Sequence, residues 1–91
     1  MHKELYHCTT PKKFARYVAS RAILPPVRGF STESAAREWC KKTGRTIILR
    51  IIGSAHPLPD HKQRSGTAWW IKEPVAHWET VWTKPAEEAL T

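Results

Sequence analysis

The stretch Leu5-Tyr6-His7-Cys8-Thr9-Thr10, closed by Pro11, decides how the chain is organised. Its first residues predict a strand, while Thr10 followed by Pro11 predicts a helix with threonine at its N-cap. His7 therefore lies where a strand gives way to a helix, a junction that offers a ligand free backbone N–H groups and a positive helix dipole. Two interpretations of His7 stay open: a functional side chain, or a half-buried structural one beside Tyr6.

Two amphipathic helices are predicted downstream of this stretch. After Pro11, apolar residues recur at helical spacing as far as about Arg21. A second helix should begin after Ser31 or Thr32 and end at Gly44, which suits a left-handed terminator. The inner stripe of the second helix is predicted to comprise Ala35, Ala36, Trp39 and Cys40.

Strand patterns fill most of the remaining chain. Thr46–Ile52 is apolar on both faces and predicts an interior strand, whereas residues 53–67 predict a long polar loop. Shorter strands are predicted at Val27–Phe30, Ala68–Ile71 and Trp78–Trp82. We therefore expect one α+β domain over residues 1–83, with a small, twisted, mostly antiparallel sheet and two helices, and a disordered polar tail over residues 84–91.

Composition narrows the expected partners. Fifteen Lys and Arg against eight Asp and Glu give a formal net charge of +7, which favours an anionic partner such as a nucleotide or nucleic acid. Cys8 and Cys40 are predicted to be free thiols of a cytoplasmic protein. No apolar run could span a membrane, and the His and Cys spacings match no metal-site pattern, so we expect neither a membrane partner nor a metal.

The order of three segments resembles that of small ADP-ribosyltransferase-like domains. These segments are Tyr6-His7-Cys8-Thr9 on the first strand, Phe30-Ser31 before the second helix, and the strand Thr46–Ile52. The resemblance covers roughly residues 4–52 and, loosely, the tryptophan-containing strands that follow. It implies a minimal ADP-ribosyltransferase core with NAD as the cofactor.

The resemblance also implies roles for residues around the first strand. His7 would hydrogen-bond the nicotinamide ribose of NAD, and Cys8 and Thr9 would border the nicotinamide. Phe30 and Ser31 would form the facing wall, where an aromatic ring stacks on the nicotinamide.

The acid that such domains carry on a late strand corresponds best to Glu79, with Glu73 as the nearest substitute. It would polarise a ribose hydroxyl and stabilise an oxocarbenium-like transition state electrostatically. We further expect the polar loop to close over the same face, so that Asp60 and His61 join the cofactor site.

Three functions are therefore kept as hypotheses. The first is NAD-dependent ADP-ribosyl transfer, with His7 and Glu79 as the catalytic candidates. The second is a noncatalytic basic module in which a basic face and the loop with His61, Lys62 and Arg64 hold nucleic acid or another anion. Lys12, Lys13 and Arg16, which share one helix face, are its first candidate contacts. The third is a protein-interaction domain that uses the tryptophan strands. The sequence alone does not decide among them.

Overall fold

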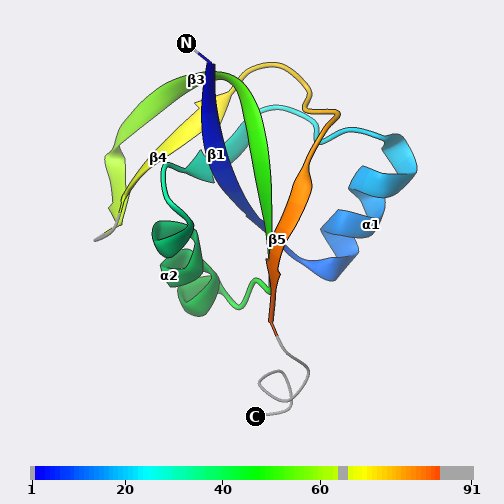
Figure 1. Ribbon diagram of the computed structural model, residues 1–91, viewed down its shortest axis with the longest axis horizontal. Coiled ribbons are helices and arrows are strands. Elements are labelled where there is room, and N and C mark those ends of the chain that lie inside the picture. The colour runs from blue at the N-terminus through cyan, green and yellow to red at the C-terminus, as the bar shows by residue number, and fades with distance from the viewer. Residues whose placement is uncertain (1, 64–65, 85–91) are drawn as a thin grey trace.

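The computed structural model describes residues 2–63 and 66–84, with the side chains of 59–63 outside that description. It contains two helices and five strands (Figure 1). In chain order these are β1 (His2–Thr9), α1 (Pro11–Ser20), β2 (Val27–Phe30), α2 (Glu33–Thr43), β3 (Ile47–Gln63), β4 (Gly66–Ile71) and β5 (Glu79–Thr83). The predicted tail falls outside the described residues except for Lys84, whose N–H donates to the carbonyl of Thr46 over 2.8 Å.

Both helices begin and end where the sequence predicts. The Thr10 hydroxyl accepts the N–H of Lys13 at the start of α1, and Thr32 caps α2 in the same way. The end of α2 is Gly44 at φ 73°, the left-handed backbone that glycine tolerates best. At the end of α1, Arg21 takes a similar conformation, with φ 61°.

The strands form an antiparallel sheet that closes on itself. Around the ring the order is β1, β2, β4 and β3, and β3 pairs with β1 again to complete it. The fifth strand, β5, adds to the side of β3. The α+β class with two helices and a mostly antiparallel sheet is confirmed, but the sheet, predicted as twisted, forms a four-stranded ring plus one strand.

The ring closes because β3 is long enough to pair with both β1 and β4. It extends far beyond the strand Thr46–Ile52 that the sequence predicts. Its first half pairs with β1 through Ser54, and its second half, from Ala55 onward, pairs with β4. The loop predicted over residues 53–67 is therefore wrong. The two prolines in this segment are typical of a loop. They are tolerated in β3 because this part of the strand pairs with β4 alone, so its other edge needs no N–H donor.

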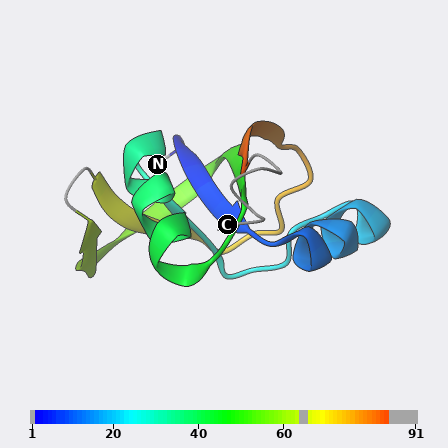
Figure 2. The same ribbon diagram turned by 90° about the horizontal axis from the view of Figure 1, so that it is seen from below.

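Side chains alternate across the strands and build two apolar clusters. The first lies on the inner face of the ring and includes Leu5, Ile51 and Ile71. The second lies on the outer face beneath α2 and includes Phe30 and Ile48. Figure 2 shows α2 close against the strands and α1 set apart at the other end of the molecule. Neither described helix is long and apolar enough to cross a membrane.

Candidate functional site

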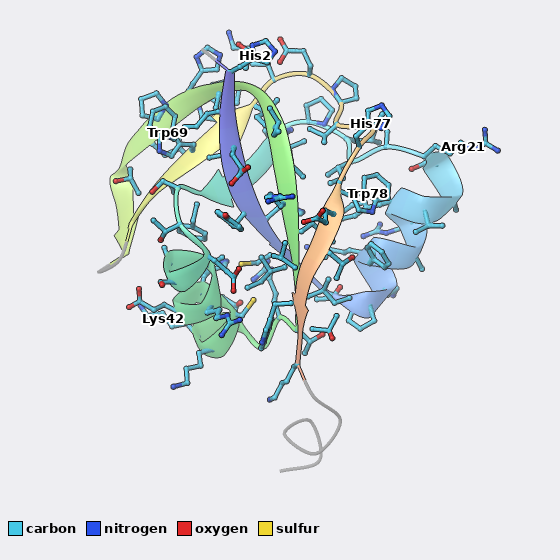
Figure 3. The ribbon with its side chains drawn as sticks, viewed as in Figure 1. His2, Arg21, Lys42, Trp69, His77 and Trp78 are labelled. Carbon is cyan, nitrogen blue, oxygen red and sulfur yellow. The ribbon has the colours of Figure 1, made fainter. Side chains whose placement is uncertain are left out.

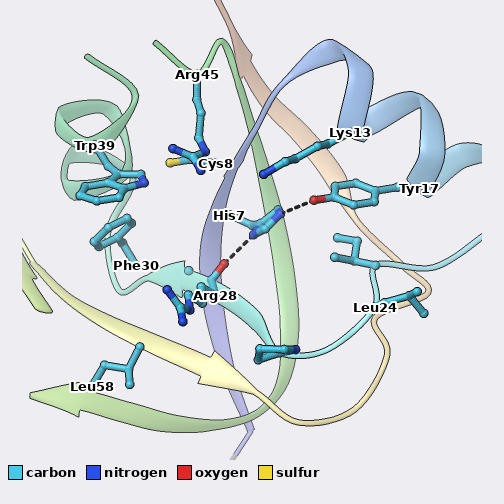
Figure 4. Close-up of a pocket in the computed structure, with 13 residues that line it drawn as sticks. His7, Cys8, Lys13, Tyr17, Leu24, Arg28, Phe30, Trp39, Arg45 and Leu58 are labelled. Atoms are coloured by element: carbon cyan, nitrogen blue, oxygen red, sulfur yellow. Dashed lines mark hydrogen bonds between the residues drawn. The ribbon is translucent and has the colours of Figure 1, made fainter. Parts of the chain in front are cut away.

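A pocket of about 520 Å³ opens where β1 and β2 part, between the two helices (Figure 4). The two strands share one registered pair, Tyr6 with Phe30. Close approach at this seam requires glycine at position 29. A methyl group there would lie 2.9 Å from Cβ of Leu5 and 3.2 Å from the carbonyl oxygen of Tyr6. Residues 7 and 8 of β1 then turn toward the pocket, with Arg28 and Phe30 of β2 opposite.

His7 joins three elements through hydrogen bonds. Its Nδ1 lies 2.5 Å from the carbonyl oxygen of Arg28, and its Nε2 lies 3.1 Å from the hydroxyl of Tyr17 on α1. A carbonyl can only accept, so Nδ1 carries the proton, and in the neutral ring Nε2 accepts from Tyr17. The buried hydroxyl of Thr9 donates in turn to the Tyr17 oxygen over 3.3 Å. Both ring nitrogens of His7 are thus bonded within the chain.

The surroundings of His7 favour its neutral form. Burial lowers the pKa of the imidazole most, because a charged ring would lose its hydration. The hydrogen bond to the Arg28 carbonyl raises the pKa in opposition, while the positive charges of Arg45 and Lys13 lower it further. Since the net pKa shift is downward, His7 is neutral at pH 7, and its Nε2 accepts the hydrogen bond from the Tyr17 hydroxyl.

Positive charge dominates the walls of the pocket. Lys13 projects from α1, Arg28 from β2, and Arg45 from the segment between α2 and β3. Among the described residues, no carboxylate lines the pocket, and none forms an ion pair with these three cations. The pocket is therefore a concave surface whose positive charge is not balanced by any carboxylate among the described side chains.

An aromatic wall stands opposite the His7 side. The rings of Phe30 and Trp39 lie 6.0 Å apart at 50°, and the guanidinium of Arg45 lies 6.0 Å from the Trp39 ring. Trp39 was predicted to belong to the buried stripe of α2 with Ala35 and Ala36. Both alanines are buried, but Trp39 is half-buried and faces the pocket. This wall offers the half-buried ring of Trp39, packed against the buried Phe30, beside a positive charge.

The two cysteines are free thiols that interact with each other. Cys8 donates from Sγ to the carbonyl oxygen of Ala36 over 3.1 Å, and Cys40 is buried nearby on α2. Interaction with the Cys40 thiol, followed by burial, raises the pKa of Cys8, and the interaction with Cys8 lowers the pKa of Cys40. Cys8 therefore keeps its proton and lines the pocket as a thiol.

The structure brings together only part of the predicted site. His7, Cys8 and Phe30 line the pocket. Thr9 is fully buried beneath it, so its hydroxyl serves Tyr17 instead. The Ser31 hydroxyl accepts the backbone N–H of residue 67 over 3.1 Å, which ties β2 to β4 rather than facing a ligand.

The residues predicted from later in the chain lie elsewhere. Glu79 forms an ion pair with Arg50 over 2.7 Å and does not line the pocket, and Glu73 is exposed after β4. The backbone of Asp60 and His61 belongs to β3 rather than to a closing loop, and their side chains lie outside the described part of the structure. Among described residues, no group of three potential metal ligands is assembled.

Several pocket residues were not predicted as a site. Lys13 was placed with Lys12 and Arg16 on one basic face, yet it turns toward the pocket while the other two are exposed. The spacing of four between Lys13 and Tyr17 could have revealed this, since it places both on one side of α1. Arg28 and Arg45 carry no comparable local signal. Comparison with protein families, curated proteins and solved structures finds no match to this chain.

Proposed function

We propose that the pocket binds a nucleotide, a ligand that combines phosphate groups with a flat ring. The observation that carries this proposal is the set of three cations around an aromatic-lined pocket with no described carboxylate among its walls. A volume of about 520 Å³ lies within the range typical of small-molecule sites.

Each part of such a ligand has a chemical counterpart. Guanidinium and ammonium groups form strong charge-assisted hydrogen bonds to phosphate, and Lys13, Arg28 and Arg45 reach the pocket from three directions. The Phe30–Trp39 pair supplies the apolar surface on which a base stacks. Every chemical group that nucleotide binding requires is present among the described pocket residues. Nucleotide binding is therefore our first candidate function.

A second candidate is the ADP-ribosyl transfer that the resemblance implies. One observation favours it: the pocket lies between His7 and Phe30, where the resemblance places NAD. NAD is itself a nucleotide with a pyrophosphate, so the two proposals share a ligand class. Transfer would require a carboxylate at the ribose, and Glu79 would have to leave Arg50 to supply it.

Isothermal titration calorimetry with ADP at low salt tests the binding role. We expect Lys13→Ala to weaken binding about tenfold, because a charged hydrogen bond to phosphate is lost. Lys12→Ala removes the same charge from the exposed neighbour and should change affinity by less than about twofold. If both variants weaken binding equally, ADP is held by nonspecific electrostatic attraction rather than by the pocket. If the unaltered protein does not bind ADP, the proposal is refuted.

A parallel assay separates transfer from binding. The protein is incubated with NAD, and the nicotinamide released is quantified with and without the Glu79→Gln substitution. Release that depends on Glu79 would show that the nicotinamide–ribose bond is cleaved, and ADP-ribose recovered on an acceptor side chain rather than free in solution would establish transfer. NAD binding without release would leave the pocket as a binding site alone.

A further inference from the structure

A row of side chains crosses three strands next to the pocket. Arg28 on β2 lies directly opposite Trp70 on β4, and Trp70 lies directly opposite His56 on β3. Directly paired residues project from the same face of a sheet, with neighbours about 5 Å apart. These three residues, called the Trp70 row below, therefore share one face.

The contacts around Trp70 give the row its chemistry. The His56 and Trp70 rings lie 5.2 Å apart at 40°, and Nζ of Lys72 lies 5.6 Å from the Trp70 ring. Arg28 and Lys72 are exposed, while Trp70 and His56 are half-buried. Two cations therefore adjoin the Trp70 ring, Arg28 in the row and Lys72 beside it, and the row includes no acidic residue.

The Trp70 row and the pocket form one continuous surface. The next row on the same face consists of Phe30, Ala68 and Leu58, and both Phe30 and Leu58 line the pocket. Arg28 belongs to the Trp70 row and also lines the pocket. The cluster beneath α2 includes Phe30 and Ala68 but not Trp70, so the row continues past the part of the face that α2 covers.

From this arrangement we infer that the protein binds a single-stranded polynucleotide, with one nucleotide in the pocket and the adjoining base stacked on Trp70. This inference rests on the proposed nucleotide site and names the polymer from which that nucleotide comes. Arg28 would contact the phosphate between the two bases, and Lys72 would swing from the Trp70 ring to the next phosphate. Single strands suit the surface because their unpaired bases can stack on aromatic side chains between basic residues.

Fluorescence anisotropy with a labelled oligodeoxythymidylate of about ten nucleotides tests the inference. Trp70→Thr should weaken oligonucleotide binding about tenfold or more, because the stacking contact is lost, while leaving affinity for ADP unchanged. Ile52→Thr is the matched control: it removes an apolar side chain from β3 that is 62% exposed and is not among the residues that line the pocket. Lys72→Ala, at an exposed position, should lower the slope of log affinity against log salt by about one.

The outcomes separate this inference from the proposed function. If ADP binds but Trp70→Thr and Ile52→Thr bind the oligonucleotide equally well, the polymer site is refuted and the nucleotide pocket stands. If neither ADP nor the oligonucleotide binds, both fail. If heparin or duplex DNA of equal charge competes as well as the single strand, the surface recognises polyanions without stacking, and the inference is overturned. A vesicle of anionic lipid that displaces the oligonucleotide equally well would overturn it too.

Discussion

The two helices start alike and serve the molecule differently. α1 and α2 contain 10 and 11 residues, and each opens with a threonine hydroxyl that accepts an N–H three residues on. Yet α2 buries Ala35, Ala36 and Cys40, whereas α1 has no buried residue. Capping is a local property of the sequence, but burial depends on what the rest of the chain places beneath a helix. α2 is part of the core, and α1 is a wall of the pocket.

α1 is held by contacts of another kind. Figure 3 places Trp78 beside α1, and its ring meets the edges of Phe14 and Tyr17 at 6.3 Å and 6.4 Å between centroids. Tyr17 also bonds to His7 and Thr9, which join the helix to β1. Aromatic edges and hydrogen bonds therefore take the place of a buried stripe, and we expect α1 to be the more adaptable side of the pocket.

The largest expected effect is a loss of stability that tests the difference in burial between the two helices, with one substitution in each. Ala36→Glu puts an unpaired carboxylate where the side chain is 0% exposed, and it should cost about 4 kcal/mol, a large share of the stability of a domain of this size. Ala15→Glu on the exposed face of α1 should change stability by less than about 0.5 kcal/mol. Urea denaturation followed by circular dichroism measures both. Similar losses would show that α1 is packed like α2.

A second prediction sharpens the role of His7 in holding α1. The pKa of His7 is lowered from its ordinary 6.5 in the folded protein, chiefly by burial, so the unfolded chain binds its proton more readily. Stability from this group is therefore complete above about pH 6.5 and declines as pH falls through the lower folded pKa. Thermal midpoints measured from about pH 8 to about pH 5 should fall less in His7→Gln than in the unaltered protein. The exposed His77→Gln is the control, and it should leave the pH profile unchanged.

The smallest effect concerns the two helix ends. Gly44→Ala forces a Cβ into the left-handed conformation that ends α2 and should cost about 1 kcal/mol. Arg21→Gly relieves the same conformation at the end of α1 and should stabilise by about 0.5 kcal/mol, since the greater freedom of unfolded glycine offsets part of the gain. Scanning calorimetry should show midpoints that move in opposite directions. Shifts of the same sign would contradict this account.

The sequence predicts features that depend on neighbouring residues more accurately than features that depend on distant ones. Both helix starts were predicted because Thr10, Pro11 and Thr32 act within one turn of their own position. The long β3 was missed because Pro57 and its polar neighbours have loop composition, and only pairing with β4 makes them a strand. Ring closure likewise depends on partners distant in sequence, which a local pattern does not encode.

The candidate site likewise contains residues that local sequence segments predict and residues that only the tertiary structure brings together. His7, Cys8 and Phe30 were predicted through a resemblance in segment order, and they do lie together at the pocket. Arg28 and Arg45 were not predicted, because an arginine in a short strand or a turn has the same local pattern whether it faces solvent or a pocket. Their convergence follows from the seam between β1 and β2, a tertiary feature.

The pairing of β1 with β3 also has a consequence for how the chain is made. Of the five described strands, β1 is synthesised before the others, and the register of Thr9 with Ile47 and His2 with Ser54 means that its partner segment follows roughly forty to fifty residues later. At ordinary rates of synthesis that delay is on the order of seconds. During that interval β1 exposes an unpaired edge and the apolar side chain of Leu5, which is fully buried in the finished ring. The nascent chain is thus most open to aggregation, and to capture by chaperones, before Ile47–Ser54 appears.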